Sequence, residues 1–248
     1  MTTQADELIV IPARYRSSRL PGKPLVDLAG KPMIVRTAER CLEVLPREQI
    51  IVATDDQRIV EVCSDAGFRV ELTRSDHLTG GDRVAEVAER FAAKTIVNVQ
   101  GDEPVFNPQD INVILEEARK DRARVLTGYC ELNEHEWHDT KFPRLIFGLH
   151  NQLIYIGRAK VPGSHDGAFH VGFRHVCIYA YPPDMLRRFA SVTARTPLEA
   201  IEDHEIMRFL EMGMPVDVVE LSSDSVAVDR PSDIERALSA IAAENSPS

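Results

Sequence analysis

The sequence has few cysteines and few aromatic residues, and it has no long apolar run. The 4 cysteines among its 248 residues show no CxxC or other metal-ligand spacing; they are Cys41, Cys63, Cys130 and Cys177. Most of them sit inside apolar stretches, so we expect buried free thiols and a reducing cytoplasm. No apolar stretch approaches the ~20 residues that cross a bilayer, and the polar, acidic residues 1–7 are unlike a signal peptide. We therefore expect a cytoplasmic protein that does not bind a membrane.

The chain also lacks the net positive charge that is typical of nucleic-acid-binding proteins. It has 29 Lys and Arg residues against 39 Asp and Glu residues, which gives a net charge of −10. This balance disfavours non-specific binding to nucleic acids, because a phosphate backbone attracts positively charged surfaces. The length allows a sizeable core, and no internal repeat or linker is evident. We therefore expect a single domain over residues 1–248.

Cations are instead concentrated in one loop near the start of the chain. An apolar run at residues 8–11 has the length of a strand, and a segment of helical character opens near Pro32. The loop between them holds Arg14, Arg16, Arg19 and Lys23. Such a concentration of positive charge in an acidic protein indicates a site for a small anion. A set of scattered surface cations is the alternative interpretation.

Segments of strand character then alternate with segments of helical periodicity. The expected strands after the first lie at residues 49–54, 69–73, 95–100 and 125–131. The expected helices lie at residues 32–45, 82–93 and 110–120, with one more between the Asp55-Asp56 cap and Gly67. This alternation with short connections predicts an α/β fold with a mainly parallel, doubly wound sheet. Ligands of such sheets lie beyond the carboxyl ends of the strands.

The pattern changes from residue 141 onward. Two apolar runs at residues 145–148 and 153–156 predict a hairpin, and a glycine-containing loop follows at residues 162–167. The remaining expected elements are a strand at 176–181, a helix at 201–212, a strand at 216–220 and a helix at 231–243. We expect residues 141–180 to form a β-rich excursion from the domain.

Two carboxylates follow strand-like runs in the same way. Asp102 stands after residues 95–100, and Asp229 stands between an apolar run and a helix that starts at Pro231. Because the basic loop, Asp55-Asp56 and residues 100–104 all follow strands, we expect them to converge on one edge of the sheet. Carboxylates beside a phosphate site can chelate Mg²⁺ between them. The alternative is that both are helix or turn caps.

Other polar groups carry weaker signals. Residues 76–83 form a polar loop with two glycines before a helix, and such loops present backbone amides to ligands. Gly101 would let the backbone approach a ligand closely. The three-residue spacing of Glu199, Glu202 and Glu205 is typical of a solvated helix face. His175 precedes a buried strand and is compatible with a structural histidine.

Taken as a set, the motifs are specific. They are IPARY at residues 11–15, SRLPGKPL at 18–25, GKPMI at 30–34, IVATDD at 51–56, VNVQGDEP at 97–104, TPLE at 196–199 and VDRPSDIE at 228–235. In this order the chain resembles the CMP-Kdo synthetases (3-deoxy-manno-octulosonate cytidylyltransferases) over nearly its whole length.

The resemblance implies a Rossmann-like nucleotidyltransferase fold, a dependence on Mg²⁺ and a homodimer. The implied activity joins CMP from CTP to a small acidic acceptor and releases pyrophosphate. CTP would be bound by Ala13, Arg14, Arg19, Lys23, Thr79, Gly80, Asp82, Arg83 and Gln100. The acceptor would be bound by Arg158, His175 and Glu205, and Mg²⁺ by Asp102 and Asp229. The expected catalytic residues are Arg14, Lys23, Asp102 and Asp229, whereas Arg16 is expected at the surface; no general base is nominated.

The sequence departs from the family pattern in one respect, the residues expected around the acceptor. The family usually has Ser-Gly-Thr-Asp/Glu-Arg where residues 79–83 stand, and many members have Gln at the position of Ile206. The loop 163–167 after Pro162 replaces an aromatic and charged segment. Because the loss of a polar partner weakens binding of a polyhydroxylated ligand, the sequence favours a small phosphonate acid such as phosphonoformate. Kdo is the alternative acceptor. A catalytically dead nucleotide-binding regulator is disfavoured by the presence of both Asp102 and Asp229.

Overall fold

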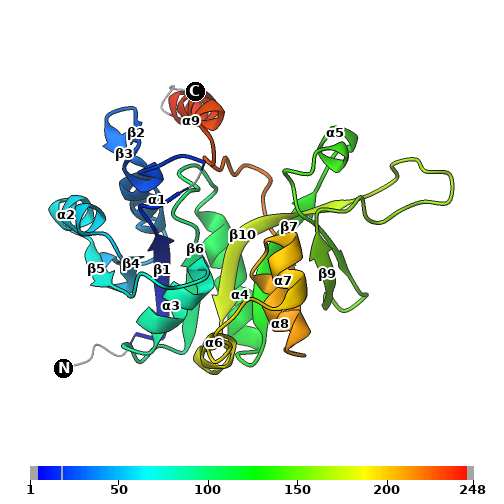
Figure 1. The fold of residues 1–248 in the computed structure, drawn as a ribbon, viewed down its shortest axis with the longest axis horizontal. Coiled ribbons are helices and arrows are strands. Elements are labelled where there is room, and N and C mark those ends of the chain that lie inside the picture. The colour runs from blue at the N-terminus through cyan, green and yellow to red at the C-terminus, as the bar shows by residue number, and fades with distance from the viewer. Residues whose placement is uncertain (1–4, 18, 245–248) are drawn as a thin grey trace.

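The computed structural model of the protein describes residues 5–17 and 19–244, so residues 1–4, Ser18 and residues 245–248 lie outside the described residues. The main sheet has the strand order β11-β7-β10-β6-β1-β4-β5, and β8 and β9 extend it beside β10 (Figure 1). The strands of this sheet are β1 (Glu7–Ala13), β4 (Ile50–Thr54), β5 (Arg69–Leu72), β6 (Thr95–Val99), β7 (Val125–Glu131), β8 (Arg144–Phe147), β9 (Leu153–Gly157), β10 (Phe173–Tyr181) and β11 (Val216–Glu220). A small second sheet pairs β2 (Asp27–Leu28) with β3 (Lys31–Pro32).

The helices fall where the periodicity predicts most of them. The α-helices are α1 (Met33–Cys41), α2 (Gln57–Asp65), α3 (Gly80–Ala88), α4 (Gln109–Lys120), α5 (Glu134–His138), α6 (Pro183–Ala190), α7 (Pro197–Glu202), α8 (Ile206–Glu211) and α9 (Pro231–Glu244). Two 3₁₀ turns, η1 (Lys23–Leu25) and η2 (Arg47–Gln49), complete the set. No helix in the described part of the chain is long and apolar enough to cross a membrane.

The centre of the sheet is parallel, as predicted. Strand β1 lies between β4 and β6 and pairs with both in parallel, and β5 adds to β4 in parallel. Every residue of β1, β4 and β6 is buried, which explains why these strands read as continuous apolar runs rather than alternating ones. The carboxyl ends of the three strands therefore meet at one edge of the sheet.

The second half of the sheet is mixed. Strand β10 runs antiparallel to both β6 and β7, whereas β11 pairs with β7 in parallel. Strands β8 and β9 form the predicted hairpin, and β8 also pairs with β10. The β-rich excursion is thus joined to the main sheet through the long strand β10.

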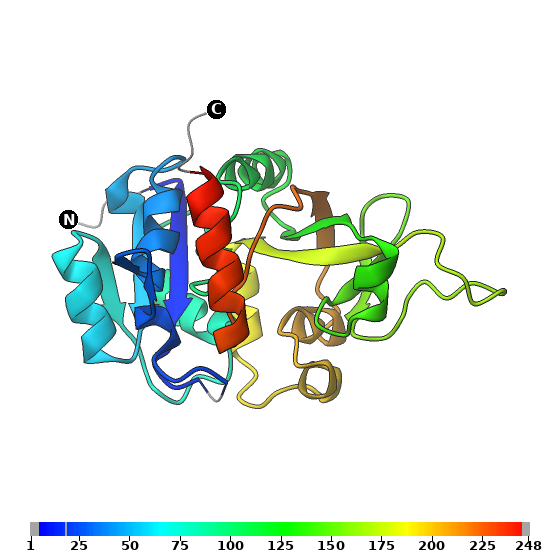
Figure 2. The same ribbon diagram turned by 90° about the horizontal axis from the view of Figure 1, so that it is seen from above.

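Helices cover both faces of the sheet, as a doubly wound fold requires. Helices α1, α2 and α4 pack with Ile9 and Ile11 on one face, while α3, α6 and α8 pack with Leu8 and Val10 on the other. Helix α9 packs with Leu28 and Met33 in a third, smaller cluster, and Figure 2 shows it alongside α1. The alternation of β1 between two cores is the pleat of a strand buried on both sides.

One expected helix is wrong. Residues 201–212 form two short helices, α7 and α8, instead of one. The break lies at Asp203, whose φ of 51° is left-handed, and its carboxylate accepts a hydrogen bond from Arg195 Nη1 at 2.8 Å. An aspartate tolerates this conformation better than most residues do. The helical periodicity continues across the break, so the pattern alone does not reveal it.

The cysteines are free, as predicted. Cys41, Cys63 and Cys130 are buried, and Cys177 is half-buried. Burial raises the pKa of Cys63 to about 12, so its thiol stays protonated and unreactive at neutral pH.

Gly101 is required by the packing of the sheet edge. A Cβ atom at this position would lie 2.7 Å from the Pro12 carbonyl oxygen and 3.0 Å from Ile34 Cδ1. We predict that Gly101→Ala lowers the free energy of unfolding by about 1–3 kcal/mol, because the backbone of β1 must move. Denaturant unfolding measures this loss. Gly163→Ala is the control, since its Cβ would meet nothing within 4 Å; an equal midpoint for both variants would contradict the packing account.

Candidate active site

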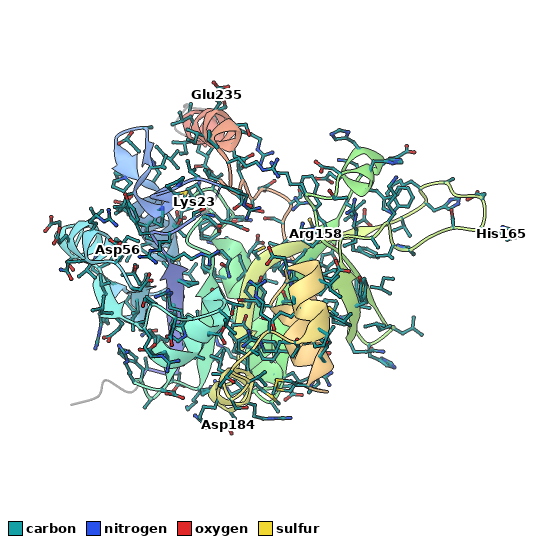
Figure 3. The ribbon with its side chains drawn as sticks, viewed as in Figure 1. Lys23, Asp56, Arg158, His165, Asp184 and Glu235 are labelled. Atoms are coloured by element: carbon teal, nitrogen blue, oxygen red, sulfur yellow. The ribbon has the colours of Figure 1, made fainter. Side chains whose placement is uncertain are left out.

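A cavity of about 390 Å³ lies beyond the carboxyl ends of β1 and β6. Its lining includes the basic loop, the start of α3, the segment after β6 and the segment before α9. Polar side chains from β10, from the α7–α8 turn and from Arg158, which follows β9, also line it. Figure 3 labels two lining residues from opposite halves of the sheet, Lys23 and Arg158. The cavity is where a doubly wound sheet binds its ligand.

The Lys23 ammonium lies between two carboxylates inside this cavity. Its Nζ atom is 2.5 Å from Asp102 Oδ2 and 3.0 Å from Asp229 Oδ1. Burial alone would lower the pKa of Lys23, but attraction to Asp102 and Asp229 outweighs it and raises the pKa above its ordinary value. Lys23 is therefore a permanent cation here, and both carboxylates converge on one point.

Backbone pairing brings the two aspartates together. Val226 N donates to the Val105 carbonyl at 2.9 Å, and Val228 N donates to the Asp102 carbonyl at 2.9 Å. This pairing aligns the segment after β6 with the segment before α9. Asp229 does not cap α9, because Asp233 Oδ2 accepts hydrogen bonds from the backbone amides of residues 229 and 230 at 3.0 and 2.9 Å. The interpretation of Asp229 as a helix cap is thus excluded.

Of the remaining cations in the basic loop, two line the cavity and one does not. Arg14 and Arg19 are exposed and line the cavity, together with Ala13. Arg19 Nη2 lies 3.4 Å from Asp229 Oδ1, so this guanidinium stands beside the Lys23 cluster. Arg16 is also exposed, as predicted, and does not line the cavity.

The start of α3 presents its first residues to the cavity. Thr79 is the N-cap and exchanges hydrogen bonds with Asp82 in a capping box. Thr79, Gly80 and Arg83 line the cavity, and so does Gln100 from the facing segment. Arg83 Nη2 is held 3.3 Å from Asp55 Oδ1. Asp55 therefore supports the site, although it does not line it.

Asp82 was expected to bind CTP, and its position in the structure does not agree with that expectation. It does not line the cavity, and its carboxylate is only 10% exposed. Asp82 Oδ1 accepts from Arg208 Nη1 at 2.5 Å, and Oδ2 accepts from Thr79 N at 2.9 Å. Its role is to hold the cap of α3 from behind.

Arg208, which the sequence interpretation missed, is buried together with Glu199. Arg208 has no exposed surface, and Glu199 accepts from its Nε at 2.8 Å and from its Nη2 at 2.6 Å. The expectation of a solvated glutamate face is therefore wrong for Glu199. Burial lowers the pKa of Arg208. The hydrogen bonds that Arg208 donates to Glu199 and Asp82 outweigh this effect and raise the pKa above its ordinary value. A lone arginine in the apolar run 206–210 is the signal that could have revealed it.

The three expected acceptor residues meet in the same cavity. Arg158, His175 and Glu205 all line it. Glu202 orients Arg158, because its Oε2 accepts from Arg158 N at 2.8 Å and its carbonyl accepts from Arg158 Nε at 3.3 Å. Glu205 Oε2 accepts from Gly81 N at 2.7 Å, while its Oε1 is buried and has no hydrogen-bond partner among the described residues. Burial raises the pKa of Glu205, which places a poorly solvated carboxyl group at this end of the site.

His204 is a further lining residue that no sequence pattern indicates. Its Nε2 lies 3.2 Å from His175 Nδ1, and His175 Nε2 lies 2.7 Å from Thr127 Oγ1. Burial, followed by the charge of Arg158, lowers the pKa of His204 to about 4. Burial also lowers the pKa of His175 well below its ordinary value. The pair is therefore neutral at physiological pH and can only offer hydrogen bonds.

The family departures mostly lie away from the cavity. Ile206 has no exposed surface and packs in the apolar core on one face of the sheet, so it faces no ligand there. Residues 163–167 do not line the cavity either, and Figure 3 shows His165 at the tip of a loop far from Lys23. The expectation that these departures alter the acceptor pocket is thus wrong for Ile206 and for this loop. Near the cavity, Thr79 and Gly81 are the residues that depart from the pattern.

Comparisons with known proteins agree with this geometry. A sequence profile described as cytidylyltransferase matches residues 8–221. The chain is 39% identical over 239 residues to 3-deoxy-manno-octulosonate cytidylyltransferase of Syntrophotalea carbinolica, covering 92% of this chain and 95% of that one. It is 34% identical to the Escherichia coli protein of the same name, covering 96% of each.

The chain is also similar to solved structures of nucleotidyltransferases. The structure of CMP:2-keto-3-deoxy-manno-octonic acid synthetase complexed with CTP superposes with a TM-score of 0.90 at 34% identity, covering 97% of this chain and 100% of that one. A cytidylyltransferase from Leptospira borgpetersenii is only 18% identical and has a TM-score of 0.65, covering 96% of this chain and 87% of that one, so it supports the fold alone.

The low pKa of His204 predicts that the stability of the protein depends on pH. The unfolded chain protonates this side chain below a pKa of ~6.5, whereas the folded protein protonates His204 only near pH 4. Stability is therefore lost as the pH falls from ~6.5 toward ~4. We predict that His204→Asn loses less stability than the wild type between about pH 7 and about pH 5. Urea midpoints measure this, and an NMR titration showing a charged His204 ring at about pH 6 would contradict it.

Proposed function

Because the chain belongs to the cytidylyltransferase family and is a CTP-dependent nucleotidyltransferase, we propose that its acceptor is 3-deoxy-manno-octulosonate (Kdo). The reaction joins CMP from CTP to the sugar acid and releases pyrophosphate. Relatives with this name are 34% and 39% identical over more than nine tenths of the chain. The observation that carries the proposal is that the acceptor residues share one cavity with Lys23.

The acceptor side suits a polyhydroxylated acid. Arg158 supplies a guanidinium for a carboxylate, with its backbone and Nε held by Glu202. Glu205 Oε1 and His204 Nδ1 are buried without a hydrogen-bond partner among the described residues, so they supply hydrogen-bonding groups for hydroxyls. A small phosphonate acid has no hydroxyl chain to satisfy these groups, and a site built to bond hydroxyls rejects ligands that lack them.

The two aspartates suit a Mg²⁺ ion. Their carboxylates, each 30% exposed, converge on the Lys23 ammonium, so they already share one positive charge. The described residues form no cluster of three or more His, Cys, Asp or Glu side chains that could hold a metal. A magnesium ion on Asp102 and Asp229 would therefore take its other oxygen ligands from phosphate and water. When bound, it would neutralise phosphate charge and polarise the transferred group.

The chain's own residues bind, orient and stabilise charge. Arg14, Arg19 and Lys23 face the phosphates and stabilise the negative charge that develops on the departing pyrophosphate. Thr79 and Gly80, which line the cavity at the start of α3, contact the nucleotide. In-line attack on the α-phosphate depends on positioning rather than on a covalent intermediate. The expected homodimer stays a prediction.

The acceptor is tested directly by product formation. We predict that the protein, CTP and Mg²⁺ convert Kdo into a CMP conjugate and pyrophosphate, both measured by mass spectrometry. Phosphonoformate in place of Kdo is the parallel arm and should give no conjugate. A conjugate with phosphonoformate and none with Kdo would reverse the proposal, and CTP binding without any product would favour the regulator hypothesis.

The aspartate pair is tested by one substitution with a matched control. We predict that Asp102→Asn lowers turnover about 100-fold or more, because a preorganised charge at the reacting phosphate is lost. It should also weaken CTP-dependent Mn²⁺ binding, measured by electron paramagnetic resonance. Asp56→Asn is the control, since Asp56 caps α2 by accepting from Arg58 N and lies outside the cavity. Near-normal Mn²⁺ binding by Asp102→Asn would refute the metal assignment.

A further inference from the structure

A fully buried arginine joins the nucleotide side of the cavity to the acceptor side. Arg208 of α8 bonds to Asp82 behind the start of α3 and to Glu199 in α7. None of its side-chain surface is exposed, and its guanidinium lies 3.9 Å from the centroid of the Phe189 ring. The two carboxylates belong to segments that are far apart in sequence.

Each carboxylate is also tied to a local cap. Asp82 accepts from the Thr79 amide and hydroxyl, and Glu199 accepts from the amide of Thr196, the N-cap of α7. The guanidinium therefore sets the distance between two helix starts. A planar fork of donors can engage two carboxylates at once, whereas a lysine ammonium is a point charge that cannot reproduce this geometry.

A second contact completes the connection. Gly81 N, in the first turn of α3, donates to Glu205 Oε2 at 2.7 Å. A Cβ atom at Gly81 would lie 3.1 Å from the same oxygen, so α3 and the α7–α8 turn are in tight contact. Any shift of the first turn of α3 thus moves the partner of Glu205, an acceptor-lining residue.

We infer that Arg208 is a positioning residue that couples nucleotide binding to acceptor binding. A nucleotide bound at Thr79 and Gly80 holds the first turn of α3. Asp82 and Arg208 transmit this position to Glu199 and α7, and Gly81 holds Glu205 toward the acceptor. Because coupling between two ligands is reciprocal, the acceptor tightens nucleotide binding by the same factor. The acceptor half of this inference rests on the proposed Kdo function.

Calorimetry tests the coupling with a non-reactive ligand. The affinity for Kdo is measured with and without a CTP analogue whose α- and β-phosphates are joined by methylene. In the wild type we expect the analogue to tighten Kdo binding about fivefold or more. In Arg208→Lys we expect less than about half of this factor to remain, because the charge is kept but the fork is lost. For a wild-type protein that does form the conjugate with Kdo, unchanged coupling in this variant, or no coupling in the wild type, would overturn the inference.

A control separates positioning from general destabilisation. Ile114→Ala opens a space in α4 on the opposite face of the sheet, where Ile114 is buried, and it should lose stability while keeping the coupling. In steady-state assays, Arg208→Lys should raise the KM for both CTP and Kdo relative to this control. If Arg208→Lys does not fold, Glu199→Gln replaces it, since that variant keeps the bond between Arg208 and Asp82. Normal coupling in Glu199→Gln would then contradict the inference.

A wrong acceptor proposal can be told apart from a wrong inference about Arg208. If the wild type forms no conjugate with Kdo, the acceptor proposal is wrong. The inference is then decided by the nucleotide alone: Arg208→Lys should bind the analogue about fivefold or more weakly than Ile114→Ala does. Equal affinities would overturn it.

Discussion

The site depends on one cation shared by two carboxylates. Lys23 Nζ lies within hydrogen-bond distance of Asp102 and Asp229, which reach it from the segments before and after the second half of the sheet. Without that ammonium, two negative charges would face each other beside a site for a triphosphate. The same arrangement keeps the two aspartates converged on one point. The parallel strands β1 and β6 supply the common edge on which the loop and the first aspartate meet.

The charged residues behind the cavity are buried and paired, unlike the exposed cations that line it. Exposed cations such as Arg14 and Arg19 are available to phosphates. Arg208, in contrast, is enclosed by Asp82 and Glu199 and touches no solvent. A buried pair of this kind contributes little net stability, yet the loss of one partner is costly, so it favours a single arrangement of α3 against α7 and α8. The start of α3 and the α7–α8 turn, which both line the cavity, thus share one support.

Much of this account follows from local sequence patterns. Buried parallel strands read as apolar runs, and their order places the basic loop and Asp102 on one edge. The patterns fail where a tertiary contact decides the outcome. Asp203 breaks a continuous helical periodicity, and the charge of Glu199 is buried only because Arg208 meets it there. Likewise, family position alone assigns Asp82 and Ile206 to the cavity, whereas packing turns both side chains away from it. The contact between His175 and His204 joins separate elements and leaves no periodic signal.

The central claim is that Lys23 and the aspartate pair form the triphosphate and metal site of a cytidylyltransferase. The most direct test is calorimetric titration of the wild-type protein with CTP, once with Mg²⁺ and once with EDTA. Because Mg²⁺ held by Asp102 and Asp229 would neutralise phosphate charge, CTP should bind about tenfold or more tightly with Mg²⁺. Equal CTP affinity in Mg²⁺ and in EDTA would contradict the claim.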